Sequence, residues 1–188
     1  MPKNLDRLPE NLPVPIDDGA CAHLINQKIP PIYLPSTAGR DICLATIAQR
    51  TVLYCYPLTG RPDLQLPQGW DQIPGARGCT VEACAFRSAY HELQVLQTQV
   101  FGLSTQTTTY QQEAVERLHL PFELLSDANL ALTKALHLPT FEVDSMILVK
   151  RLTLVLSSLG QIEKVFYPVF PPAQHADEVI TWLSGKPL

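Results

Sequence analysis

Cysteine is the residue type in this chain best suited to chemistry, and the sequence holds five: Cys21, Cys43, Cys55, Cys79 and Cys84. An odd number argues against a fully paired disulfide framework of the kind found in secreted proteins. In a reducing compartment, a cysteine is either a small buried hydrophobic residue or a reactive group. The sequence around each cysteine indicates which of the two it is.

Cys79 follows a glycine- and proline-rich stretch and begins a helical pattern. Gly78 leaves the backbone free to turn sharply into the helix. Unsatisfied N–H groups and the helix dipole favour an anion there, and Arg77 adds a cation two residues away. Such surroundings lower a cysteine pKa from about 8.5 to roughly 3.5–7.5. A cysteine in this position is either a thiolate nucleophile, of the kind that attacks peroxide oxygen and becomes a sulfenic acid, or a small residue near a helix start, and position alone leaves both readings open.

Cys84 follows Cys79 by five residues. On an intact helix this spacing gives a rise of ~7.5 Å and a rotation of ~140°, so the Cα atoms lie about 8–9 Å apart. Disulfides require Cα separations below ~7 Å. The pair is therefore either a coincidence or a switch that requires the first helical turns to unwind.

The elements expected to position these cysteines begin with Thr51–Tyr56, an apolar run that predicts a central strand with Cys55 in the core. Residues 57–78 have no periodicity and many Gly and Pro residues, which predicts a long loop. The helix that begins at Cys79 should present part of its surface to the core, with candidate positions Val81, Ala85, Tyr90 and Leu93.

The rest of the chain alternates between strand and helix patterns. Strands are expected around 32–34, 40–44, 100–104, 122–125, 146–149, 152–156 and 162–169, and helices around 110–119, 129–137 and 176–183. This order predicts an α/β fold with a mixed central sheet and helices on both faces. We expect one domain over 1–188, with residues 1–31 as an extended proline-rich N-terminal arm.

The composition excludes several other classes of function. A net charge of −4 gives no general electrostatic reason to bind nucleic acid or acidic lipid. The N-terminal residues lack the pattern of a signal or transit peptide, and no apolar run approaches a membrane span. Cys21 and His23 lack further ligands at metal-site spacing. The sequence thus predicts a soluble cytoplasmic protein without a metal or other cofactor and without a nucleic-acid or membrane partner.

The stretch GCTVEACAFRSAY, from Gly78 to Tyr90, resembles the active-site helix of the peroxiredoxin Q or bacterioferritin-comigratory group of the peroxiredoxin superfamily, whose pattern is close to GCTxEAxxFRD. The similarity continues through FGLSTQ, LLSDAN and RLTLVLSSLGQIEKVF, and covers about 51–183. It implies a thioredoxin-like fold that reduces hydrogen peroxide and organic hydroperoxides. It also implies thioredoxin or a similar dithiol as reductant, and a monomer or weak homodimer.

The resemblance assigns three site residues. Cys79 matches the peroxidatic cysteine, Cys84 the resolving cysteine, and Arg151 the strand arginine that hydrogen-bonds the thiolate and the peroxide. Without the resemblance, Arg151 would be taken for a surface charge at a strand start. Two other readings of the cysteine pair stay open: a redox-sensing or partner-binding switch, and a thiol–disulfide oxidoreductase acting on proteins.

The sequence departs from the family pattern just before Cys79. The family has a hydroxyl residue three positions before the cysteine, where this chain has Ala76, and a proline where it has Gln72. Thr59 or Thr80 is a candidate replacement for that hydroxyl.

We interpret the extra length as an insertion within residues 58–77. This segment is expected either to close over the site as a lid through Trp70 and Ile73, with Arg77 stabilising the thiolate, or to form a solvated surface loop with Arg77 in water.

Overall fold

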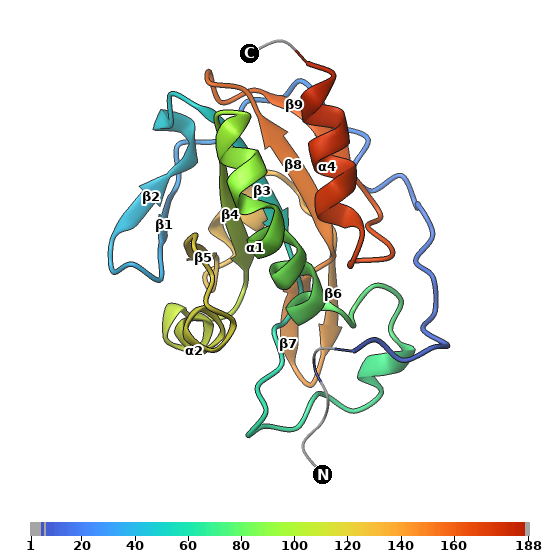
Figure 1. Ribbon diagram of the computed structural model, residues 1–188. Coiled ribbons are helices and arrows are strands. Elements are labelled where there is room, and N and C mark those ends of the chain that lie inside the picture. Colours follow the sequence, from blue (N-terminus) through green and yellow to red (C-terminus); the bar gives the residue numbers. More distant parts are fainter. Residues whose placement is uncertain (1–4, 6, 187–188) are drawn as a thin grey trace.

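The computed structural model describes Leu5 and residues 7–186, and its centre is a mixed five-stranded sheet (Figure 1). In spatial order the strands are β5 (Leu124–Ser126), β4 (Thr98–Ser104), β3 (Arg50–Cys55), β8 (Leu152–Leu156) and β9 (Ile162–Phe166). The pairs β3–β4 and β4–β5 are parallel, whereas β3–β8 and β8–β9 are antiparallel. Because β3 and β8 run in opposite directions, the end of β3 lies beside the start of β8, with Cys55 opposite Leu152.

Helices lie on both faces of this sheet, which confirms the predicted α/β class. The helices α1 (Cys79–Val95), α2 (Thr108–Leu118) and α4 (His175–Ser184) share one hydrophobic core with side chains of β3, β4 and β8. The short helix α3 (Ala131–Ala135) contributes to the core on the other face. That second core also takes in Cys21, Leu24 and Ile29, although residues 7–31 form no helix or strand.

Two small hairpins flank the main sheet. One pairs β1 (Tyr33–Pro35) with β2 (Asp41–Cys43), and it is followed by the 3-10 turn Leu44–Thr46. The other pairs β6 (Thr140–Val143) with β7 (Met146–Val149). The strand β6 was not predicted, because its four residues are exposed or half-buried and carry no continuous apolar signal.

One expectation about these elements needs correction. The predicted strand 162–169 ends at Phe166, shortly before Pro168. Of the four positions on α1 expected to face the core, Leu93 is buried, Ala85 and Tyr90 are partly buried against the same core, and Val81 is half-buried. The other buried positions of this helix are Cys79, Thr80, Glu82, Ala83 and Phe86. No helix among the described residues has the length and apolar character needed to cross a membrane.

Candidate active site

Cys79 is the first residue of α1, at the end of a segment that starts where β3 ends. Its neighbour Gly78 has φ +111° and ψ 10°, a backbone conformation that side-chain-bearing residues rarely adopt. A Cβ at Gly78 would lie 2.5 Å from Cγ of Pro172, so both the conformation and the space require glycine. Cys79 therefore lies at the N-terminal, positive end of the α1 dipole, as the sequence predicted.

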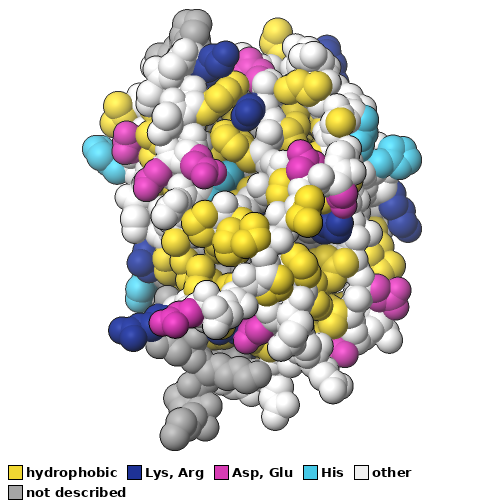
Figure 2. Space-filling model, turned by 90° about the vertical axis from the view of Figure 1, so that its right-hand side faces the viewer, with side chains coloured by type: hydrophobic (Ala, Val, Ile, Leu, Met, Phe, Trp, Pro, Cys, Tyr) yellow, Lys and Arg dark blue, Asp and Glu magenta, His cyan; other side chains and the backbone are white. Residues whose placement is uncertain are grey.

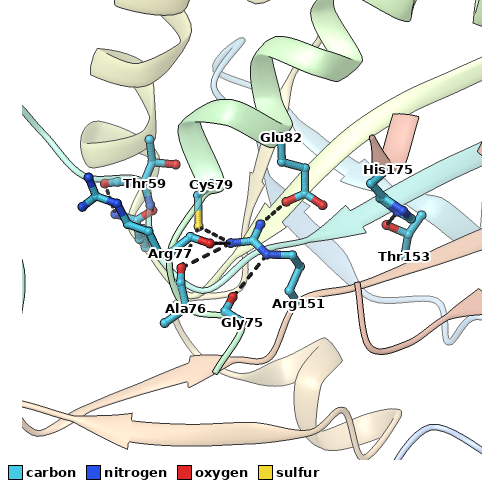
Figure 3. Close-up of polar contacts among 10 residues, drawn as sticks. Thr59, Gly75, Ala76, Arg77, Cys79, Glu82, Arg151, Thr153 and His175 are labelled. Atoms are coloured by element: carbon cyan, nitrogen blue, oxygen red, sulfur yellow. Dashed lines mark hydrogen bonds and ion pairs between the residues drawn. The ribbon is translucent and has the colours of Figure 1, made fainter. Parts of the chain in front are cut away.

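Arg151 comes to Cys79 from the short link between β7 and β8, and its side chain is only 4% exposed. Its Nη2 donates to Cys79 Sγ at 3.1 Å (Figure 3). The same guanidinium donates to the carbonyl oxygens of Gly75, Ala76 and Arg77 at 3.2–3.3 Å. Arg151 is thus a buried residue that joins the nucleophile to the loop before it, and not a surface charge.

Glu82 completes this group from one turn further along α1. Glu82 is fully buried, and its Oε2 accepts a hydrogen bond from Nη1 of Arg151, with which it also forms an ion pair. Its Oε1 has no hydrogen-bond partner among the described residues. Burial raises the pKa of Glu82 to about 7, against the lowering effect of Arg151. One buried cation therefore lies between two groups that can each become an anion.

The pKa of Cys79 differs from the sequence expectation. Burial raises the pKa of its thiol above the usual value; the Arg151 charge and the backbone N–H of Leu58 act to lower it, while Glu82 raises it further. The helix start alone predicted a lowered pKa, but the sulfur is almost fully enclosed and desolvation penalises the thiolate. The thiol also lies 3.7 Å from the Ala76 carbonyl, to which it can donate.

Thr59 lies on the side of Cys79 opposite Arg151 (Figure 3). It directly follows Leu58, whose N–H hydrogen-bonds the Cys79 sulfur. Gln106 holds Thr59 in place, because its Oε1 accepts from the Thr59 N–H at 3.0 Å and its Nε2 donates to the Thr59 carbonyl at 3.5 Å. Thr59 and Thr80 are both buried: Thr59 adjoins the residue whose N–H contacts the sulfur, and Thr80 adjoins Cys79 itself.

Residues 58–77 pack against the β6–β7 hairpin. Trp70 is 4% exposed and belongs to a small hydrophobic core with Leu58, Ala76 and Leu148, and its ring lies 6.1 Å from that of Phe141. This contradicts the solvated-loop alternative.

Arg77 is also largely shielded from water, and its guanidinium lies 3.6 Å from the Asp71 carboxylate. The cation seen to bond Cys79 is that of Arg151. The effect of Arg77 on Cys79 stays a prediction.

The other four cysteines differ in burial and position. Like Cys79, they are free thiols, and Cys84 is half-buried on the same continuous helix as Cys79. Cys21, Cys43 and Cys55 lie in the core, and burial raises the pKa of Cys21 to about 12. His23 contacts the Leu136 carbonyl at 2.9 Å, and no group of three potential metal ligands is found among the described residues.

Sequence reasoning did not place Glu82, Leu58 and Gln106 at the site. In the sequence Glu82 is simply an acidic residue of the first helical turn, and only the fold shows that the helix buries it against Arg151. Leu58 acts through its backbone N–H, which no residue type reveals. Gln106 lies in the quoted stretch FGLSTQ, so proximity to a family motif was its one signal.

A cysteine at a helix N-terminus, bonded by a buried arginine from the link between β7 and β8 in a thioredoxin-like fold, defines a thiol oxidoreductase. Comparisons with known proteins narrow this class. A model of the AhpC/TSA family matches residues 73–165. The chloroplastic peroxiredoxin Q of Sedum lineare is 30% identical over 157 residues, which cover 83% of this chain and 75% of that protein. That of Gentiana triflora is 26% identical over 183 residues, covering 94% and 76%.

Solved structures show the same fold. The peroxidoxin BcpB of Mycobacterium tuberculosis superposes with a TM-score of 0.72 at 23% identity, covering 87% of this chain and 98% of that one. A peroxiredoxin Q structure from Xanthomonas campestris gives a TM-score of 0.65 at 20% identity, covering 93% and 97%. The chain belongs to the peroxiredoxin family of AhpC/TSA type, and it is a thiol-dependent peroxidase.

Proposed function

We propose that this chain reduces hydrogen peroxide and organic hydroperoxides by a two-cysteine cycle within one polypeptide. The Cys79 thiolate attacks the outer peroxide oxygen, the O–O bond breaks, and the leaving alkoxide or hydroxide takes a proton, which gives a Cys79 sulfenic acid and an alcohol or water. The Cys84 thiol then attacks the Cys79 sulfur, releases water and forms a disulfide. Thioredoxin or a similar dithiol reduces that disulfide to two thiols and is itself oxidised.

The observation that carries this proposal is the 3.1 Å contact between Arg151 Nη2 and Cys79 Sγ. A guanidinium there stabilises the thiolate and can also donate to the developing charge on a peroxide oxygen. The Leu58 N–H adds a further donor on the same sulfur, and the position at the start of α1 places it at the positive end of the helix dipole. We further propose that the Thr59 hydroxyl replaces the missing one at Ala76, with Gln106 holding its backbone.

Cys84 supports the second step by its place on α1. Its five-residue spacing from Cys79 on one unbroken helix leaves the Cα atoms about 8–9 Å apart. A bond between them therefore requires the first turn to unwind.

The test is NADPH consumption coupled through thioredoxin reductase and thioredoxin, with hydrogen peroxide as substrate. Wild type should turn over rapidly and Cys79→Ser should be inactive, because no other thiol has these surroundings. Cys21→Ser is a matched control: its thiol is equally buried, but it has no cation in hydrogen-bonding contact, so this variant should stay active. Near-normal peroxide reduction by Cys79→Ser would reject the proposal.

One observation favours a second function, a redox sensor that uses the same cysteine pair as a conformational switch. The pKa of Cys79 is raised by its burial, which would slow peroxide attack. A sensor would oxidise once with peroxide and be recycled slowly by dithiols. Rapid multiple turnover in the coupled assay would exclude it.

A further inference from the structure

Part of the N-terminal arm, Leu5 and residues 7–18, packs against the loop that carries Cys79. At Gly78, a Cβ would lie 3.2 Å from Cδ2 of Leu8. At Gly75, it would lie 3.6 Å from the ring of Pro15. At Gly60, near the other end of the inserted segment, it would lie 3.0 Å from Cδ2 of Leu5. Three apolar arm residues thus pack on three glycines of one segment.

The arm is fixed at its far end by polar contacts. Asp18 accepts hydrogen bonds from Lys150 Nζ and from the Tyr167 hydroxyl, both at 2.8 Å. These two hydrogen bonds, Lys150 first, lower the pKa of Asp18 to about 2. Between this anchor and Leu8, Pro15 and its neighbours share a cavity of about 380 Å³ with Pro74, Gly75 and Arg151.

The arm runs along the face of the molecule shown in Figure 2, where hydrophobic side chains gather near the centre. Its own contacts are unequal. Leu8 and Pro15 are half-buried against the Cys79 loop, whereas Ile16 beside them is 84% exposed. Only some arm side chains can therefore hold the loop.

Disulfide formation requires that loop to move. Cys79 and Cys84 lie on one continuous helix, so the first turn of α1, closed by the bond from the Glu82 N–H to the Gly78 carbonyl at 2.9 Å, must open before they meet. Opening that turn displaces Gly78 from Leu8, and Gly75 from Pro15. The contact of Arg151 with Cys79, on which peroxide attack depends, is by contrast already present in the closed structure.

We propose that Leu8 and Pro15 are positioning residues that strap the Cys79 loop closed and so slow the second half of the reaction without changing the first. This inference rests on the proposed two-cysteine cycle. A slow second step leaves the sulfenic acid exposed to a second hydroperoxide, which oxidises it to sulfinic acid and leaves as alcohol or water. The strap therefore sets the peroxide concentration at which Cys79 is lost to over-oxidation.

The experiment compares wild type, Leu8→Ala/Pro15→Ala and the control Ile16→Ala in single turnovers with hydrogen peroxide. Thiol alkylation at timed intervals and mass spectrometry count thiol, sulfenic, disulfide and sulfinic forms of Cys79. The double variant should form the disulfide about three- to tenfold faster, since two half-buried apolar contacts no longer oppose opening. Its rate of Cys79 oxidation should stay within about twofold of wild type, and its sulfinic fraction at high peroxide should fall. Ile16→Ala should match wild type.

Amide hydrogen exchange of reduced protein without peroxide gives an independent reading. Amides of residues 78–82 should exchange faster in the double variant by the same factor, while those of β3 and β4 stay protected and show that the fold is intact. Equal disulfide rates and equal exchange in the double variant and wild type would overturn the strap. Failure of wild type to form any Cys79–Cys84 bridge would instead reject the two-cysteine cycle, and exchange would still test the strap.

Discussion

Replacing Arg151 with Met tests how far one buried cation controls the reactivity of Cys79. The guanidinium nitrogen lies 3.1 Å from the sulfur. At that distance, two unit charges attract by about 1.3 kcal/mol at the dielectric constant of water and by about 5 kcal/mol at an effective value of 20. Since one pKa unit corresponds to about 1.4 kcal/mol, removing the cation should raise the Cys79 pKa by about one to four units.

Each unit above the assay pH lowers the thiolate fraction about tenfold, so oxidation of Cys79 by peroxide should slow at least tenfold. The single variant also leaves Glu82 buried without its partner, which costs about 3–5 kcal/mol of folding stability. Arg151→Met/Glu82→Gln removes that orphaned group. It should regain most of the stability and still react slowly.

Ultraviolet thiolate absorbance, corrected with the Cys79→Ser variant, measures the pKa. Stopped-flow peroxide reaction gives the rate constant, and denaturant unfolding gives the stability. Because Glu82 itself raises the Cys79 pKa, the reference for the double variant is Glu82→Gln alone. If the double variant has the same Cys79 pKa and the same rate constant as Glu82→Gln, the reasoning from the Arg151 contact is wrong.

The other predictions concern the loop, the resolving cysteine and a buried histidine. Gly78→Ala should lower the free energy of unfolding by at least about 1–3 kcal/mol in denaturant titrations, because of its φ of +111° and the contact with Pro172. Cys84→Ser should still oxidise Cys79 in one turnover but lose dithiol-driven turnover in the coupled assay, and full turnover would show that another thiol resolves. His175 has a pKa lowered to about 3, chiefly by burial, so its contribution to stability is present above pH ~6.5 and is lost as pH falls towards 3. The stability advantage of wild type over His175→Gln should therefore decrease by up to about 1.4 kcal/mol per pH unit in this window, and parallel stability curves would exclude this role.

The sequence predicted the strand before the site, the helix after it and the α/β class, because each depends on local apolar patterns. The sequence could not predict that α1 turns a charged side chain toward the protein interior. From the sequence, Glu82 looks like a solvent-facing acidic residue of a first helical turn. In the structure α1 buries it against Arg151, which is 69 positions away in sequence. A pairing over that separation depends on the register of β3 with β8, which no local pattern encodes.

The inserted segment shows the same limit at shorter range. Its glycines and prolines predicted a loop, and the structure has only the 3-10 turn Trp70–Gln72 within it. What the sequence left open was its packing partner. That partner is the β6–β7 hairpin, and β6 itself gave no recognisable strand signal.

The contacts of Arg151 also limit how far α1 can open. Oxidation and resolution make opposite demands on the first turn of α1. Cys79 must stay beside Arg151 for its oxidation by peroxide, and it must leave Arg151 to form the disulfide. Glu82 lies on that same turn and is ion-paired with Arg151 in a fully buried position. If unwinding continued past Glu82, it would separate two buried charges, at a cost of several kcal/mol. Cys79, however, needs to approach Cys84 by only about 2 Å at the Cα atoms to reach disulfide range. The Glu82–Arg151 pair is therefore expected to stay in place as the limit of opening, while Gly75–Thr80 moves and its carbonyls release Arg151.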